Sequence, residues 1–283
     1  MMNDLYRCAA VFSAKNILVY HNGQYQKAII SAKINDQILV GDFLSCEMVY
    51  DQIQANRIVQ RKNLISRLQA GKVQGLAANV DIVFIVTSAN RDFNLARLER
   101  YYILAKESGA RICFVLSKVD LTDQHGELAD IITSRFPGSV VERTSIYQPD
   151  TESALFHHWY ENETAVFLGS SGVGKSSLIN LMLENEVIKT SCVRESDDRG
   201  RHTTTVRHMY LLSDQRVVID TPGLRSVGIS AKADTIDELF PEIKELEMQC
   251  KYKNCSHLSE PGCAIRNAIE REELDYNRYL RYL

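Results

Sequence analysis

The segment GSSGVGKSS, at residues 169–177, constrains the possible folds of this chain more than any other part of the sequence. The spacing Gly-x-x-x-x-Gly-Lys-Ser is that of a phosphate-binding loop, which needs a strand before it and a helix after it. Both are predicted, because the apolar run TAVFL at 164–168 precedes the loop and a helical pattern at 177–183 follows it. The alternative, a glycine-rich turn that precedes Lys-Ser by chance, would not explain the predicted strand before it or the predicted helix after it.

A loop of this kind binds phosphate oxygens mainly through backbone N–H groups at a helix N-terminus. Lys175 is expected to bridge the β- and γ-phosphates and so to take part in catalysis, and Ser176 is expected to give a hydroxyl ligand to Mg²⁺. The residues expected at the phosphates are Gly169, Ser170, Ser171, Gly172, Val173, Gly174, Lys175, Ser176 and Ser177.

A second motif, VVIDTPG at 217–223, ends another apolar strand pattern. Asp220 is expected to hold Mg²⁺ through water, and the backbone N–H of Gly223 is expected to contact the γ-phosphate. Between the two motifs lies GRHTTT at 200–205. We expect Thr204 to complete the magnesium shell and to act in catalysis, with its two neighbouring threonines left open.

The motif SKVD follows the apolar run RICFVL and has the form of a loop that reads a guanine base. The Asp120 carboxylate can accept from N1–H and the exocyclic amine of guanine, a pair that adenine cannot offer, and the Lys118 methylenes can lie along the base. Ser117 stands where such loops usually have Asn, and its shorter side chain predicts weaker base binding. An ordinary strand-to-helix turn is the alternative. The residues expected at the base are Ser117, Lys118, Val119, Asp120 and, through a backbone N–H after the next strand, Ser145.

The order of these motifs is unusual, because SKVD precedes the phosphate-binding loop, whereas in the usual GTPase chain it follows. Joining the ordinary ends of such a chain and opening it elsewhere gives this order and keeps the sheet intact, since the termini of a fold often lie close together. Apolar strand patterns alternate with helical patterns, which indicates a parallel sheet covered on both faces. The strand patterns lie at 81–86, 111–116 and 164–168, and the helical patterns at 95–108, 126–135 and 154–160. We predict a circularly permuted α/β P-loop GTPase fold at residues 66–228.

The N-terminal region has a different pattern. Short β-rich runs fill residues 6–50, and His21-Asn22-Gly23-Gln24 is a signal for a type I′ hairpin. They predict a small closed β-domain at residues 1–65. Five basic residues and no acid follow between Arg57 and Lys72, a segment that we interpret as a linker; a solvated basic surface is an equally weighted alternative.

The C-terminal segment CKYKNCSHLSEPGC brings three cysteines and one histidine together within 14 positions. Three thiolates and one imidazole form a closed tetrahedral set of the structural zinc type. Buried cysteines beside a surface histidine are the alternative. The expected zinc ligands are Cys250, Cys255, His257 and Cys263. We predict a helical zinc-binding domain at residues 229–283, with a charged helix from about Cys263 onward.

These motifs together resemble the RsgA (YjeQ) family of circularly permuted GTPases, which act in maturation of the small ribosomal subunit. The segments that carry the resemblance are, in order, AANVD at 77–81, SKVD, GSSGVGKSS, GRHTTT, DTPGL and the Cys/His segment. The resemblance implies that the N-terminal β-barrel is an OB-fold, in which VGDFL at 40–44 matches a Gly-Asp turn. It also implies binding to the 30S subunit and its rRNA, turnover stimulated by that subunit, and GTP or GDP, Mg²⁺ and one Zn²⁺ as cofactors.

One departure from other GTPases bears on hydrolysis. After Gly223, where many GTPases have a glutamine that orients water, this chain has Leu224, which cannot form a hydrogen bond with its side chain. His202 is a candidate substitute, and a surface histidine that contacts phosphate or RNA is an equally good interpretation of it.

The remaining composition restricts the class of protein. No run of 18 apolar residues and no signal-peptide pattern is present, and seven cysteines, an odd number, fit a reducing compartment better than a disulfide framework. We expect a cytoplasmic monomer with no membrane partner. Two other functions stay open at this point: a nucleotide-gated RNA-binding module with incidental hydrolysis, and an ATPase in which SKVD is accidental.

Overall fold

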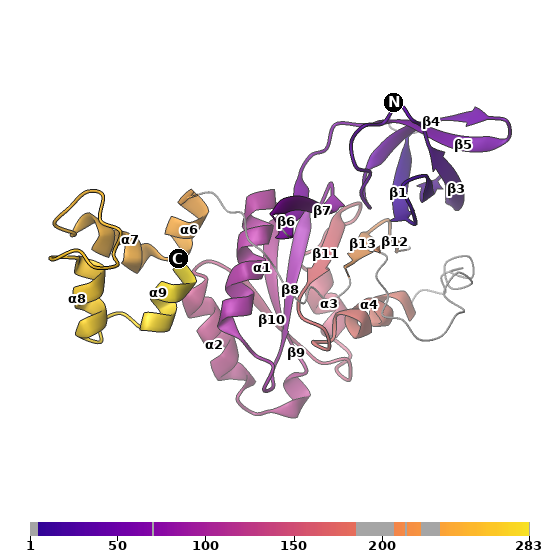
Figure 1. The fold of residues 1–283 in the computed structure, drawn as a ribbon. Helices are drawn as coiled ribbons and strands as arrows, with labels where there is room; N and C mark the ends of the chain where they lie inside the picture. The colour runs from indigo at the N-terminus through magenta and orange to yellow at the C-terminus, as the bar shows by residue number, and fades with distance from the viewer. Residues whose placement is uncertain (1–4, 70, 185–206, 213, 222–232, 283) are drawn as a thin grey trace. The chain divides into compact units, whose positions relative to one another are not determined.

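The computed structural model describes residues 5–69, 71–184, 207–212, 214–221 and 233–282. The chain divides into two compact units, Met1–Ile229 and Ser230–Leu283. The first contains a small β-barrel and a larger α/β domain, and the second consists of short helices (Figure 1). Among the described helices, none is long and apolar enough to cross a membrane.

The predicted closed β-domain is confirmed as a five-stranded barrel. Its first strand pairs with both the second and the fourth, and the third pairs in parallel with the fifth, so the ring of hydrogen bonds closes. The Asn22-Gly23 turn has the two positive φ angles, 46° and 83°, that a type I′ hairpin requires. The strands are β1 (Tyr6–Val11), β2 (Asn16–His21), β3 (Gln24–Ile30), β4 (Phe43–Val49) and β5 (Gln52–Ile58). Residues such as Ile17, Val19 and Leu44 fill its interior.

The interpretation of the basic segment as a linker was wrong beyond residue 63, where a β-hairpin begins. Its first residues end β5, residues 59–63 connect β5 to β6, and from Leu64 onward the chain forms an antiparallel hairpin of β6 (Leu64–Gln69) and β7 (Lys72–Ala78), so the domain boundary expected at residue 65 falls within β6. Its basic residues have specific partners, because Arg61 pairs with the fully buried Asp42 at 2.7 Å and Lys62 pairs with Asp81. LISRLQ has no regular alternation of apolar and polar residues, so its pairing with β7, rather than a local pattern, makes it a strand.

The α/β domain has a sheet in the order β10-β9-β8-β11-β13-β12. The first five of these strands are parallel and β12 is antiparallel to β13. Their bounds are β8 (Ile82–Ser88), β9 (Arg111–Ser117), β10 (Val140–Thr144), β11 (Thr164–Leu168), β12 (His208–Leu211) and β13 (Val217–Asp220). The strand that leads into the phosphate-binding loop, β11, is therefore central, although it comes late in the chain, as the permuted order predicts.

Helices connect the parallel strands. They are α1 (Leu95–Ser108), α2 (His125–Arg135), α3 (Thr151–Phe156) and α4 (Lys175–Glu184), with a short 3₁₀ turn η1 (Val119–Leu121) after β9. The side chain of Asn94 caps α1, and Gly109, at φ 72°, ends it as predicted. Helix α3 begins three residues earlier than its sequence pattern suggested. The indole N–H of Trp159, beyond its end, donates to the Glu163 carbonyl at 3.0 Å.

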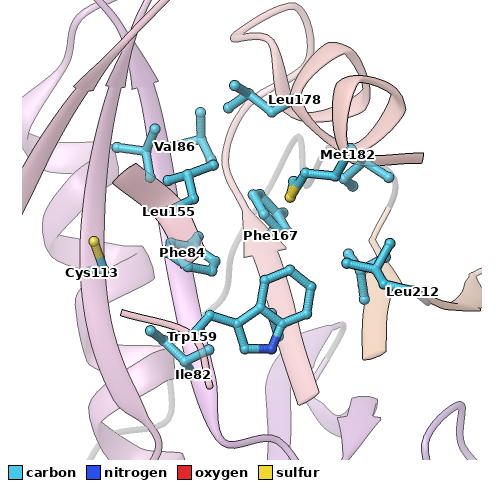
Figure 2. Close-up of a cluster of buried hydrophobic side chains, with 14 of the residues drawn as sticks. Ile82, Phe84, Val86, Cys113, Leu155, Trp159, Phe167, Leu178, Met182 and Leu212 are labelled. Atoms are coloured by element: carbon cyan, nitrogen blue, oxygen red, sulfur yellow. The ribbon is translucent and has the colours of Figure 1, made fainter. Parts of the chain in front are cut away.

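Aromatic side chains form the centre of the α/β core. Figure 2 shows Phe84, Trp159 and Phe167 among the buried side chains that join the sheet to α3 and α4. The rings of Phe84 and Phe167 stack with centroids 4.9 Å apart, and the indole meets Phe84 edge-on at 6.2 Å. This packing fixes β8 and β11 side by side, directly beneath the loops at their carboxyl ends.

The C-terminal unit contains α6 (Ala233–Leu239), α7 (Pro241–Met248), α8 (Ala264–Glu270) and α9 (Tyr276–Tyr282). Where the sequence predicted one charged helix after Cys263, the structure has two. Glu272, at φ 61°, adopts the left-handed conformation between them, and the Leu274 N–H returns to the Ala268 carbonyl, which ends α8.

Candidate functional site

Those expected nucleotide residues that the structure describes lie at one edge of the sheet. Strands β9, β11 and β13 are parallel, with β8 between β9 and β11, so their carboxyl ends lie at the same edge of the sheet, which is where ligands bind in open α/β sheets (Figure 1). In the pairing of β8 with β9, Ser117 lies opposite Ser88. In the pairing of β11 with β13, Asp220 lies opposite Phe167, which is two residues before the phosphate-binding loop. The base motif and the phosphate motif are thus neighbours in space, although about 50 residues of chain separate them.

The phosphate-binding loop depends on its glycines. A Cβ at Gly169 would lie 2.4 Å from the Val86 carbonyl oxygen, so only glycine allows the loop to pack this closely on β8. Gly172 and Gly174 have φ angles of 83° and 100°, in the region that favours glycine. These conformations turn the loop into the start of α4, as the motif predicted.

Lys175 is buried beneath this loop. Its Nζ donates to the carbonyl oxygens of Gly169, at 2.9 Å, and Ser170, at 2.7 Å. Burial lowers the pKa of Lys175 to about 8, against a smaller opposite effect of the Asp220 charge. An ammonium held here by carbonyl dipoles has little compensating negative charge, which phosphate oxygens would supply.

Asp220 ends β13 beside the loop. Burial raises the pKa of its carboxyl group, and the positive charges of Lys175 and His208 oppose that shift only in part. A divalent cation would compensate the buried carboxylate. The hydroxyl of Ser176, exposed in the first turn of α4, and the Asp220 carboxylate are the hard oxygen ligands that Mg²⁺ prefers. His208, opposite Asp220 in the ladder, was not predicted, because strand pairing alone brings it there.

The base motif borders a cavity of about 260 Å³. Lys118 has φ 58°, a left-handed conformation that turns the chain sharply after β9. Asp120 is exposed at the cavity, while Val119 packs into the core with Leu116 and does not line it. The cavity is lined by Ser117, Lys118, Asp120, Leu121, Thr144, Ile146, Tyr147, Gly174, Ser177 and Leu178.

Leu121, Tyr147 and Leu178 were missed in the sequence, whereas Ile146 lies in the segment 144–146 that was expected near the base. Leu121, Ile146 and Tyr147 are 61%, 43% and 81% exposed, which offers apolar surface to a flat ring. Ser145 itself is buried and not among the lining residues, and its carbonyl accepts from the Thr151 hydroxyl at 2.7 Å. The sequence signal was the position just after β10, which pointed to the correct loop but not to its side chains.

Side chains of the base motif bind the phosphate-binding loop directly. The Ser117 hydroxyl lies 2.5 Å from the Val173 carbonyl oxygen and 3.0 Å from that of Thr87, and its single hydrogen can be donated to one of them at a time. The Lys118 ammonium donates to the Gly172 carbonyl at 2.6 Å. Serine therefore joins the two loops despite being shorter than the asparagine that is usual here. A Cβ at Gly174 would lie 3.5 Å from the Ser117 hydroxyl oxygen, so the loops are in van der Waals contact.

Several expected residues lie outside the described part of the chain. They are His202, Thr204 and Gly223, with the neighbours Thr203, Thr205 and Leu224. Ser170 and Ser171 are in place, and the Ser170 hydroxyl lies 3.5 Å from both the Tyr101 hydroxyl and an Arg97 nitrogen.

In the C-terminal unit, the four expected zinc ligands come together. Their ligand atoms all lie within 4.8 Å of one another. Nδ1 of His257 is 3.6 Å from the Cys250 sulfur and 3.5 Å from the Cys263 sulfur, and the two sulfurs are 4.0 Å apart. Zinc bond lengths of about 2.3 Å to sulfur and about 2.0 Å to nitrogen, in a tetrahedron, give sulfur–nitrogen edges of about 3.5 Å and sulfur–sulfur edges of about 3.8 Å. The donor set fits zinc, and the three edges among Cys250, His257 and Cys263 are close to those of a zinc tetrahedron.

Comparison with known proteins agrees with this geometry. The sequence model of the RsgA GTPase family matches residues 58–230. Small ribosomal subunit biogenesis GTPase RsgA 2 of Vibrio vulnificus (strain CMCP6) is 37% identical over 268 residues, which cover 94% of this chain and 75% of that protein. Small ribosomal subunit biogenesis GTPase RsgA of Methanosarcina acetivorans is 40% identical over 245 residues, 84% of this chain and 66% of that protein.

Solved structures share the fold. YjeQ from Thermotoga maritima superposes with a TM-score of 0.67 at 22% identity, over 99% of this chain and 95% of that chain. YloQ, described as a circularly permuted GTPase, superposes with a TM-score of 0.61 at 24% identity, over 98% and 92%. A family match over more than half of the chain, together with relatives of this identity along most of its length, shows that the protein belongs to the RsgA GTPase family and is a GTP-hydrolysing enzyme.

Proposed function

We propose that this GTPase acts in late assembly of the 30S ribosomal subunit, that it binds the subunit and its rRNA, and that the subunit stimulates its turnover. The names of its relatives support the partner, because they are called small ribosomal subunit biogenesis GTPases. Membership of a GTPase family argues against the ATPase interpretation of SKVD. The protein would work as a cytoplasmic monomer.

The observation that carries the nucleotide assignment is the direct contact between the two loops. Ser117 and Lys118 bind the backbone of the phosphate-binding loop, so a nucleotide whose base lies at Asp120 would have its phosphates over Gly169 to Lys175. Because the same side chains border the base cavity and hold the loop, base binding and phosphate binding would reinforce each other.

The proposed roles at the phosphates follow from charge and position. Lys175 would bind the β- and γ-phosphates, and Ser176, Asp220 and Thr204 would hold Mg²⁺, which neutralises charge that develops on the phosphates. The backbone N–H of Gly223 would contact the γ-phosphate. His202 would orient the attacking water, because Leu224 cannot.

The proposed zinc site has a structural role. Cys250, Cys255, His257 and Cys263 would occupy all four positions of the metal, which leaves none open for substrate. A unit as short as Ser230–Leu283 has a small core, and metal binding would contribute directly to its folding.

Binding to the subunit should depend on the nucleotide. In sequence, the proposed γ-phosphate contact at Gly223 comes a few residues before the C-terminal unit. A loop ordered by γ-phosphate would therefore be joined directly to that unit and could change how it binds the 30S subunit. We expect tighter 30S binding with a non-hydrolysable GTP analogue than with GDP in a sedimentation assay at one fixed salt concentration.

Gly223→Ala should reduce the difference between the two nucleotide states and leave GDP binding largely unchanged, because the added methyl group would hinder the backbone contact. Equal 30S affinity in both nucleotide states would contradict this coupling and favour a plain RNA-binding module.

A further inference from the structure

The ring of His257 has two different environments, and this inference rests on the proposed zinc site. Nδ1 faces the sulfurs of Cys250 and Cys263, at 3.6 Å and 3.5 Å. Nε2 points to the Glu247 carboxylate, 3.4 Å away, which is within a few tenths of an ångström of a normal N–H···O hydrogen bond. Nδ1 is therefore the nitrogen that faces a metal, and Nε2 is the nitrogen available to donate a proton to Glu247.

Glu247 is positioned by the same turn that supplies a ligand. It is the penultimate residue of α7, and the Cys250 N–H donates to its carbonyl at 3.1 Å. Its carboxylate is largely covered, with 23% of the side chain exposed, and the His257 side chain is 12% exposed. A contact between two such shielded groups is less weakened by water than a surface ion pair.

Glu247 has a second strong partner, at the end of the chain. The Tyr282 hydroxyl, in α9, donates to Glu247 Oε1 at 2.7 Å, and the Lys244 ammonium lies 3.4 Å from Oε2. Helix α9 is held against the preceding helices by Arg278, which donates to Glu242 at 2.6 Å and to the Leu239 carbonyl at 2.7 Å. Tyr282 is thus placed firmly enough to fix the carboxylate.

We propose that Glu247 and Tyr282 are positioning residues of the zinc site. Glu247 accepts the Nε2–H of His257, which fixes the tautomer that has its free lone pair on Nδ1, toward the metal. Tyr282 holds Glu247 in the rotamer that makes this contact. Partners of this kind orient metal-binding histidines and make them better ligands, and their loss commonly weakens metal binding 10- to 100-fold. Through this chain of contacts, docking of the last helix and zinc affinity depend on each other.

The test is a zinc titration of the full chain in competition with a chromophoric chelator. Glu247→Ala should weaken zinc binding by roughly 10- to 100-fold, and Tyr282→Phe by a smaller factor. Glu247→Gln should retain most of the affinity, because its amide oxygen accepts the same two hydrogen bonds. Glu245→Ala is the matched control, since Glu245 is an exposed acid on the same helix, and it should bind zinc like the parent protein.

A second readout separates positioning from general destabilisation. A long-range ¹H–¹⁵N spectrum of the zinc-loaded protein should show His257 protonated at Nε2, and Tyr282→Phe should change the Nε2–H signal. A parent protein that binds no zinc would overturn the zinc site itself. If the parent protein binds zinc and Glu247→Ala binds it with the same affinity, the positioning role alone is overturned. The same holds if His257 of the zinc-loaded parent protein is protonated at Nδ1.

Discussion

Replacing Asp120 with asparagine should change the base preference of the enzyme from guanine to xanthine. Asp120 is exposed at the base cavity, beside Lys118 and Ser117, so its carboxylate is free to accept from N1–H and the exocyclic amine of guanine. The N–H of an asparagine amide would face the exocyclic amine of guanine, which is also a donor. In xanthine, the C2 carbonyl takes the place of that amine and can accept a hydrogen bond from the amide. GTP affinity should fall by roughly 100-fold or more, because a site built to hydrogen-bond a group discriminates strongly when that bond is lost.

The measurement is a competition titration of GTP against xanthosine triphosphate with both proteins. Asp123→Asn is the control, because Asp123 is exposed on the same loop but does not line the cavity. It should leave the preference for GTP unchanged. If Asp120→Asn also kept that preference, Asp120 would have no role in base selection.

Replacing Lys175 with methionine should weaken binding of a non-hydrolysable GTP analogue by roughly 10- to 150-fold, since a charge-assisted hydrogen bond contributes about 1.5–3 kcal/mol. Hydrolysis should fall further, because the same ammonium neutralises charge in the transition state. The length of methionine preserves the packing beneath the loop, so the loss reports on the charge.

The pH dependence of this binding gives an independent check on Lys175. The charged form binds phosphate, and the pKa of the free protein's lysine is about 8, below the ordinary value of 10.5. Affinity should therefore be constant below about pH 7 and fall as pH rises through 8, by approximately tenfold per pH unit above it. Lys175→Arg should remove this dependence, because arginine keeps its charge over the same range. A parent protein whose affinity does not change up to about pH 9 would show that Lys175 is not the titrating group.

Local patterns predicted most of the α/β fold. The phosphate-binding loop has fixed spacing, and its flanking strand at 164–168 and the helix ending at Gly109 follow from apolar periodicity and glycine conformation. The permuted order could also be predicted from the sequence, since it depends only on SKVD coming before the phosphate-binding loop. The linker was mispredicted because LISRLQ, which forms β6, has no regular apolar-polar alternation, and only its pairing with β7 makes it a strand.

Contacts between distant segments could not be predicted in this way. No sequence pattern links Tyr147 to the base cavity, or Tyr282 to Glu247 and hence to His257, because these pairs form only when separate elements pack. The Cys/His cluster was predictable as a set from its spacing, whereas which nitrogen of His257 faces the cysteine sulfurs required the fold. Chemistry that needs fixed local spacing is visible in a sequence, and its supporting contacts are not.

GTP turnover by the purified protein, with and without purified 30S subunits at saturating Mg²⁺, tests the proposed function most directly. With leucine at position 224, the chain lacks the usual water-orienting glutamine, so we expect slow hydrolysis by the protein alone. Subunits should raise the rate at least about tenfold, because a group supplied or ordered by a partner can contribute far more than that in GTPases. Purified 50S subunits should not, and Lys175→Met should remain inactive in every mixture. A rate that 30S subunits leave unchanged would contradict the proposal and leave a nucleotide-gated RNA-binding module whose hydrolysis is incidental.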